Sequence, residues 1–267
     1  MRRTKLAWPI YALTLAWIAG ACGSALADEP RRIRVLSYNI HHGEGVDGKL
    51  DLGRIAGVIR SVEPDLVSLQ EVDRGVKRSE GLDEPAELGR LTGMTSIFER
   101  NIPYQGGEYG NAVLSRWPVK GHKNVPLPSN YVGEQRGALA VDLTTPEGKS
   151  PIRLIATHLD SRPDDKERLD SVKSIEQMAA EAPDLPTLLV GDLNALPESR
   201  VLGAFQTNWK RANPEPLPTF PVAKPTRQID YVLVRPASRW KVIECRVLDE
   251  AVASDHRPLL VVLEWID

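Results

Sequence analysis

The stretch PTLLVGDLNALP, residues 186–197, contains a short apolar run that ends abruptly in polar residues. Its aliphatic and β-branched residues 187–190, bounded by a proline and a glycine, predict a buried strand. Asp192 and Asn194 follow directly. A turn would account for these residues on steric grounds alone. They would also place a carboxylate and an amide at one edge of a sheet, and this stretch alone leaves both interpretations open.

Two strands near the start of the chain repeat this pattern. Residues 33–39 read IRVLSYN and end on Asn39, and residues 65–69 read DLVSL and run into Glu71 after one glutamine. Between them, residues 51–62 carry apolar side chains at helical spacing behind an aspartate suited to an N-cap. A right-handed strand–helix–strand crossover brings both strand ends to the same edge of a sheet.

Three later strands also carry polar groups at one end. The strand predicted at 152–158 ends on a polar group, whereas those predicted at 229–234 and 259–265 have theirs at or before the start. If the last two strands run antiparallel to the early ones, every polar group reaches one edge, which predicts mixed sheets. The groups are His158, Asp230, Asp255 and His256.

The rest of the chain predicts an α/β (α+β) protein with one domain from residue 28 to residue 267. We find no internal repeat and no linker long enough to force a second domain. Further strands are expected at 95–99, 110–116 and 135–143, a helix at 164–181, a loop with a short helix at 73–92 and a long surface loop at 206–227.

The polar groups at strand ends each have a structural explanation as a cap, a turn residue or a solvated end. Together they are harder to dismiss, because few folds collect carboxylates, amides and two imidazoles on one rim without using them. The set consists of Asn39, Glu71, His158, Asp192, Asn194, Asp230, Asp255 and His256.

This residue set suits phosphoryl chemistry with a hard metal ion. Glu71, supported by Asn39 and Asp255, offers oxygen ligands of the kind that Mg²⁺ or Mn²⁺ takes while sharing substrate phosphate oxygens. Zinc is disfavoured, because thiolates are absent and the histidines lack metal-ligand spacing on one element.

Proton transfer and charge stabilisation can be assigned to the remaining groups. His256 and Asp230 make a base and the carboxylate that orients it. Asn194 and His158 can donate hydrogen bonds to a non-bridging phosphate oxygen as charge builds on it.

The order of the motifs resembles the endonuclease/exonuclease/phosphatase superfamily, whose members include deoxyribonuclease I and bacterial sphingomyelinases. The resemblance covers roughly residues 33–265, and GDLN followed by SDH is its most specific part. The motifs are SYNI at 37–40, LQEV at 69–72, GNAVLSR at 110–116, ATHLD at 156–160, GDLN at 191–194, IDYVLV at 229–234 and SDHRP at 254–258.

The resemblance implies a four-layer αββα sandwich of two mixed β-sheets flanked by helices. It implies metal contacts from Asn39, Glu71 and Asp255, proton handling by His256 with Asp230, and phosphoryl contacts from Asn194 and His158. Asp192 would position or activate the attacking water, and whether Asp192 or His256 is the general base stays open. Substrate contacts are expected from Arg116, His41 and Asn111, although a plain surface arginine also accounts for Arg116.

The first 27 residues have the pattern of a signal peptide: a basic start, an apolar stretch and Ala25-Leu26-Ala27 as a cleavage site. A lipoprotein anchor at Cys22 fits less well, because the position three before it is Ala. We expect an exported protein, periplasmic or secreted. Cleavage after Ala27 removes three basic residues and no acidic one, so the formal net charge changes from −2 to −5. Cys245 would then be the one remaining cysteine, and we expect a buried structural thiol.

These features favour an exported metal-dependent phosphoesterase, acting on a phosphodiester by in-line attack of water. The substrate class stays open between nucleic acid, a phospholipid head group and a small phosphate ester. The acidic balance weighs against tight binding of nucleic acid. We expect a monomer without a transmembrane segment in the mature chain. The alternative is a catalytically inactive binding or scaffold protein on the same fold.

Overall fold

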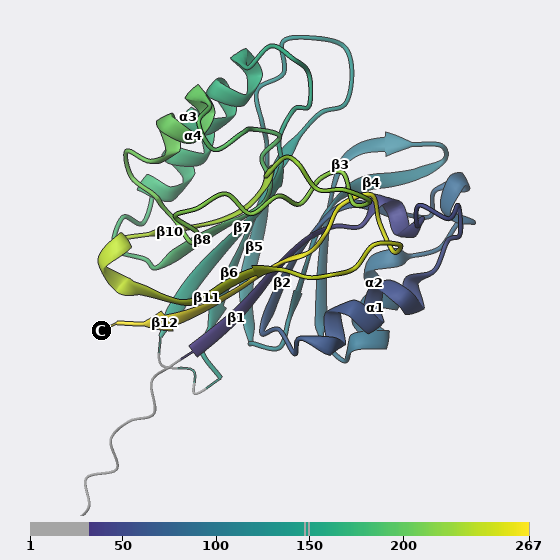
Figure 1. Cartoon of the computed structure of the whole chain (residues 1–267), viewed down its shortest axis with the longest axis horizontal. Helices are drawn as coiled ribbons and strands as arrows, with labels where there is room; N and C mark the ends of the chain where they lie inside the picture. Colours follow the sequence, from purple (N-terminus) through teal and green to yellow (C-terminus); the bar gives the residue numbers. More distant parts are fainter. Residues whose placement is uncertain (1–31, 147, 149, 267) are drawn as a thin grey trace, which may run out of the picture.

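The computed structural model describes residues 32–146, 148 and 150–266. The predicted signal peptide and the alternative anchor at Cys22 therefore lie outside the described residues. Within the described part of the chain, the strands form two six-stranded sheets that face each other (Figure 1).

The first sheet has the order β11-β12-β1-β2-β4-β3 and the second has the order β5-β6-β7-β8-β10-β9. The first consists of β1 (Arg32–Asn39), β2 (Leu66–Arg74), β3 (Thr95–Tyr104), β4 (Gly107–Ser115), β11 (Trp240–Val247) and β12 (Leu259–Trp265). The second consists of β5 (Val119–Pro126), β6 (Gly137–Thr144), β7 (Pro151–His158), β8 (Thr187–Asp192), β9 (Lys210–Arg211) and β10 (Asp230–Arg235).

Both sheets are mixed, as the positions of the polar groups predict. β1 runs parallel to β2 and antiparallel to β12, while β8 runs parallel to β7 and antiparallel to β10. The late strands therefore begin at the edge where the early strands end.

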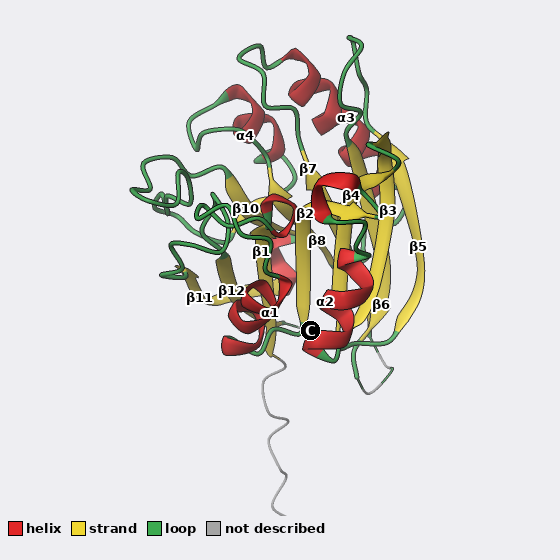
Figure 2. Ribbon diagram, turned by 90° about the vertical axis from the view of Figure 1, so that its right-hand side faces the viewer, coloured by secondary structure: helices red, strands yellow, loops and turns green. Residues whose placement is uncertain are grey.

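Helices cover the two outer faces, which gives the predicted αββα sandwich (Figure 2). Two lie on the first sheet and two on the second. They are α1 (Leu52–Ser61) and α2 (Glu84–Thr92), then α3 (Lys166–Ala180) and α4 (Arg200–Phe205). Short 3₁₀ turns occur at η1 (His41–Gly43), η2 (Lys77–Ser79) and η3 (Ala237–Arg239). None of the helices described is long and apolar enough to cross a membrane.

Three apolar layers hold the sandwich together, and strand alternation decides which side chains enter each. In β1, Val35 packs between the sheets whereas Leu36 packs under the helices. In β8, Val190 faces the other sheet whereas Leu189 faces α3 and α4. The side-chain period of two therefore predicts which strand-end residues point inward.

Several elements differ from the sequence-based expectation. β2 continues past Glu71 to Arg74 because a β-bulge lets the strand pass the polar residue without ending. The sequence did not predict β5, α4, β9 or β11; the segment expected to be a loop at 206–227 contains the two-residue strand β9. Cys245 on β11 is half-buried rather than buried, and burial raises the pKa of its thiol to about 12.

Candidate active site

Regular strand pairing places three of the predicted residues side by side at the end of the second sheet. His158 on β7 is the register partner of Asp192 on β8, and Asp192 is the register partner of Asp230 on β10. All three share the inward face with Val190. They are at least 95% buried, so their charges interact with little screening by water.

The first sheet supplies Asn39 and Glu71 to the same place. Asn39 Nδ2 lies 3.0 Å from Glu71 Oε1 and 3.4 Å from Asp192 Oδ2, so the amide joins the two sheets. Glu71 occupies the bulge in β2 and has a left-handed φ of 59°. Leu69 and Val72 on either side of the bulge face the helices. The bulge therefore lets a carboxylate reach the inner face where plain alternation would send it outward.

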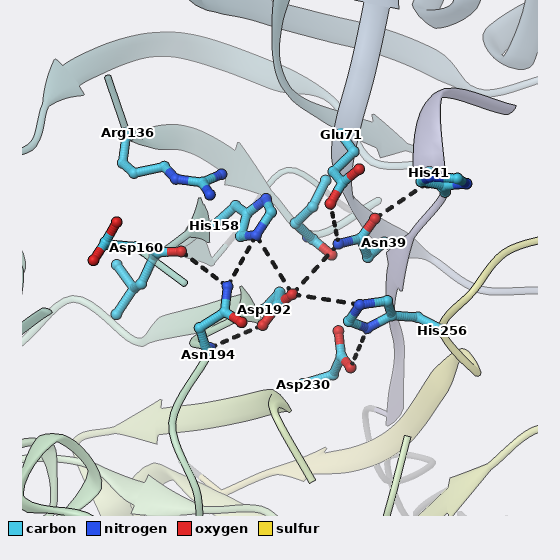
Figure 3. Close-up of polar contacts among 12 residues, drawn as sticks. Asn39, His41, Glu71, Arg136, His158, Asp160, Asp192, Asn194, Asp230 and His256 are labelled. Atoms are coloured by element: carbon cyan, nitrogen blue, oxygen red, sulfur yellow. Dashed lines mark hydrogen bonds and ion pairs between the residues drawn. The ribbon is translucent and has the colours of Figure 1, made fainter. Parts of the chain in front are cut away.

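His256 comes from the loop before β12 and connects the sheets a second time (Figure 3). Its Nδ1 lies 2.9 Å from Asp230 Oδ2, and its Nε2 lies 3.7 Å from Asp192 Oδ2. The Thr219 hydroxyl donates to the same Asp230 oxygen at 2.6 Å. The Ser254 hydroxyl, which donates to the Asn39 carbonyl at 2.7 Å, fixes the loop against β1. Asp230 therefore sets the direction of the imidazole, with Nε2 toward Asp192.

Burial and neighbouring charges shift the proton affinities of this cluster. For His256, burial lowers the pKa, but the carboxylates of Asp230 and Asp192 outweigh it and raise the pKa to about 10. Burial and the adjacent Asp230 raise the pKa of Asp192. Burial, followed by the charges of Arg136 and His256, lowers the pKa of His158 well below its ordinary value. The surroundings therefore shift the pKa values of the two imidazoles in opposite directions.

Asn194 follows Asp192 in a left-handed conformation, and its amide is fully engaged. Its Nδ2 donates to the Leu159 carbonyl at 3.0 Å and to His158 Nε2 at 3.1 Å. The carbonyl can only accept, so the amide orientation is fixed and His158 Nε2 must be an acceptor. Both amide hydrogens are used within the protein in this arrangement.

A cavity of about 680 Å³ opens over these residues. It exposes Glu71, Asp192, Asn194, His158, Asp255 and His256, together with residues that the sequence did not single out. Those are chiefly Arg78, Arg136, Tyr109, Glu134, Phe220 and Arg227.

Arg136 is the most informative of the residues that sequence reasoning missed. Its side chain is 9% exposed, one nitrogen pairs with Glu134, and the buried Nε has no hydrogen-bond partner among the described residues. It sits directly before β6, so the rule that identified Asp230, a polar group at a strand end, would have identified it too.

The structure corrects the prediction that Arg116 contacts substrate. Arg116 follows Ser115, which pairs with Leu66 at the start of β2, so it lies at the opposite end of the sheet from Glu71. It is exposed and its Nε donates to the Pro64 carbonyl at 2.9 Å. The motif match could not reveal this, because β4 runs away from the site toward Arg116.

The two other residues expected to contact substrate, Asn111 and His41, lie nearer to the site than Arg116. Asn111 is buried and donates to the Gly137 carbonyl at 3.1 Å, a link between the sheets, and it does not line the cavity. His41 is half-buried beside Asn39, whose Oδ1 accepts from the His41 backbone N–H at 3.1 Å.

Two groups of three side chains are close enough for one metal ion within the described residues. One is Asp192, Asp230 and His256, and the other is His41, His42 and Glu71. In each group the ligand atoms lie within 4.8 Å of one another. Of the predicted set, Glu71 and Asp255 line the cavity, whereas Asn39 is fully buried with its Nδ2 toward Glu71.

Comparison with known proteins supports the fold and the family. The model of the Endonuclease/Exonuclease/phosphatase family matches residues 36–256. The chain is 28% identical over 240 residues to the uncharacterized protein YbhP of Escherichia coli (strain K12), covering 85% of this chain and 94% of that protein.

Two solved structures are similar over most of the chain. An endonuclease/exonuclease/phosphatase from Beutenbergia cavernae is 27% identical, with a TM-score of 0.71 over 88% of this chain and 72% of that one. A mannosyl-6-phosphatase from Bacteroides thetaiotaomicron has a TM-score of 0.71 at 19% identity, over 88% of this chain and 100% of that one.

Proposed function

Because the chain belongs to the endonuclease/exonuclease/phosphatase family, whose members are hydrolases of phosphoester bonds, we propose that it hydrolyses a phosphodiester by in-line attack of water. The observation that carries this proposal is the His256 imidazole, held by Asp230 at 2.9 Å with its other nitrogen toward Asp192. His256 and Asp192 line a cavity that is large enough for a small phosphate ester.

A divalent cation of the Mg²⁺ or Mn²⁺ class fits the residues present. Glu71 and Asp255 line the cavity and offer carboxylate oxygens, and Asn39 fixes Glu71 by donating from Nδ2 to Glu71 Oε1. Asp192 and Glu134 line the cavity as well, which brings its lining carboxylates to four. When bound, such an ion stabilises charge on the phosphoryl group and the leaving oxygen.

The protein's own groups supply positioning and proton transfer. Asp192 accepts a hydrogen bond from the attacking water and directs it at phosphorus. Asp230 accepts from His256 Nδ1, and the raised pKa of His256 favours a second proton on Nε2, which the ring can donate to a phosphoryl or leaving oxygen. Asn194 supports Asp192 through its backbone N–H, which donates to Asp192 Oδ1 at 2.8 Å, and its side-chain amide fixes His158 beside Asp192.

Arg136 adds a phosphate-binding group to the set expected from the motifs. Its position on the cavity wall suits a contact between its guanidinium and a non-bridging oxygen. His41, beside Asn39, stays a candidate for a substrate or metal contact. We further propose export through the segment 1–27, which suits an extracellular or periplasmic substrate.

The test is hydrolysis of bis-p-nitrophenyl phosphate and p-nitrophenyl phosphate by the purified protein with Mg²⁺, Mn²⁺ or EDTA. We expect cleavage of the diester that needs the metal and stops in EDTA. The ratio of the two rates separates a diesterase from a monoesterase. If neither compound is cleaved and calorimetry detects no Mg²⁺ or Mn²⁺ binding, the alternative of an inactive binding protein replaces this proposal.

A further inference from the structure

Next to the oxygen-rich site, two adjacent histidines converge on Glu71. One ring nitrogen of His41, one ring nitrogen of His42 and one carboxylate oxygen of Glu71 lie within 4.8 Å of one another. We propose that these three side chains form a second metal site, selective for a borderline transition metal such as Zn²⁺. The site shares Glu71 with the cation of the proposed function, but its binding chemistry does not depend on that reaction.

His41 has the hydrogen bond that orients a metal-ligating imidazole. Its Nδ1 lies 3.1 Å from the carbonyl oxygen of Glu44. A carbonyl can only accept, so Nδ1 carries the hydrogen and the lone pair of the neutral ring is on Nε2. Metal-bound histidines commonly donate their other N–H to a carbonyl or carboxylate in this way.

His42 supplies the independent evidence for a ligand. Its residue is 7% exposed, and its buried Nδ1 has no hydrogen-bond partner among the described residues. Its Nε2 faces the Glu44 carboxylate at 3.7 Å. A buried polar atom without a partner is unfavourable, and a metal ion would provide the missing contact. Glu44 thus lies beside both rings: its carbonyl oxygen accepts from His41, and its carboxylate faces His42.

The local backbone explains how neighbouring residues can serve one ion. Side chains of consecutive residues point to opposite faces of a strand and diverge on a helix. His41 and His42 instead both have left-handed φ values, 47° and 45°, and their ring centroids are 4.4 Å apart in an edge-on arrangement. This turn directly follows Asn39, so it delivers both rings beside the end of β1.

The donor types decide which metal the site prefers. Two imidazole nitrogens with one carboxylate are a known ligand combination for zinc and for other first-row transition metals, whereas Mg²⁺ prefers oxygen ligands. The other three-residue group is less suited to zinc, because both nitrogens of His256 already face carboxylates, at 2.9 Å and 3.7 Å.

The experiment is a titration of the metal-free full-length protein with Zn²⁺ by calorimetry, and with Co²⁺ by visible absorption, in excess Mg²⁺. We expect the wild type to bind and to give a Co²⁺ spectrum typical of nitrogen ligands. His41→Gln and His42→Asn should each weaken binding by more than about tenfold. His122→Gln, which changes an exposed histidine on β5, is the matched control and should bind like the wild type.

Three results would overturn the proposal: no Zn²⁺ binding by the wild type, unchanged binding by the His41 and His42 variants, or an equal loss in His256→Gln. Circular dichroism in EDTA checks that each variant folds. Should the histidine variants fail to fold, Glu71→Gln removes the carboxylate ligand and keeps both rings, and its unchanged Zn²⁺ affinity would count against the site. Diester hydrolysis in Mg²⁺ alone reports on the proposed function, so either proposal can fail without the other.

Discussion

The two sheets contribute to the site in different ways. From the second sheet, His158, Asp192 and Asp230 arrive on three neighbouring strands in regular register. From the first sheet, His41 and Glu71 arrive on left-handed residues, one in a turn and one in a bulge. Regular strand pairing sets the distances between the second-sheet residues. Irregular backbone, in contrast, puts the first-sheet residues at positions that regular strands could not reach.

This difference assigns distinct tasks to the two halves. The second-sheet half of the site, which consists of His158, Asp192 and Asp230, is buried. Its carboxylate Asp230 is paired with His256. The first-sheet half surrounds Glu71, which is half-buried and lines the cavity. Proton transfer suits the rigid, buried half, and an exchangeable ion suits the half with access to the cavity.

Removing His256 should have the largest effect, because it connects the two halves. His256→Ala takes away the imidazole between Asp230 and Asp192, and we expect diester hydrolysis to fall by about 10³-fold. Circular dichroism should report a folded protein. Rates near those of the wild type would remove His256 from the reaction.

The regular register itself can be broken at Gly191. This residue pairs with Thr157, one position before the His158 and Asp192 pair, and its φ is 150°. A Cβ added there would lie 1.9 Å from the Thr157 carbonyl oxygen. We expect Gly191→Ala to lower the free energy of unfolding by roughly 3 kcal/mol, measured by urea denaturation.

Gly203→Ala is the matched control for this substitution. Gly203 lies in α4, and a Cβ added there meets no atom within 4 Å. Alanine favours a helix over glycine, so this variant should be as stable as the wild type or slightly more so. Equal losses in the two variants would show that the clash with Thr157 does not decide the effect.

The first-sheet half is tested through its metal dependence. Glu71→Gln keeps the size of the side chain and removes its charge, so we expect the Mg²⁺ concentration for half-maximal hydrolysis to rise about tenfold. Glu108→Gln, on the half-buried, arginine-paired carboxylate of β4, is the control. An unchanged Mg²⁺ titration in Glu71→Gln would place the ion elsewhere.

The same contrast explains what could be predicted from sequence. Period-two alternation predicts that Asp192, Asp230 and His158 point inward, and the mixed sheets follow from their positions at strand ends. The bulge at Glu71 leaves no distinct pattern in the sequence LQEV. The left-handed turn at His41 and His42 contains no glycine at either histidine position, so the sequence does not predict it. The rule that polar groups at strand ends mark the site could have identified Arg136. Arg116 was wrongly assigned to the site, because its motif continues along β4 to the end of the strand that is far from the site.

The smallest expected effect concerns the charge on the second-sheet half. The folded-state pKa of His256 is about 10, above its ordinary value of 6.5, because Asp230 and Asp192 outweigh the burial that lowers it. The folded state therefore binds the proton more tightly than the unfolded state.

The stability that this proton contributes is fully present below pH 6.5 and is lost as the pH rises through 10. In EDTA, the wild type should lose more stability than His256→Gln as the pH rises above about 6.5, measured by urea denaturation. His122→Gln, which removes an exposed imidazole, should follow the wild type. Equal pH dependence in all three proteins would contradict a charge on His256 held by its two carboxylates, and would reverse the assignment of His256 as the proton donor.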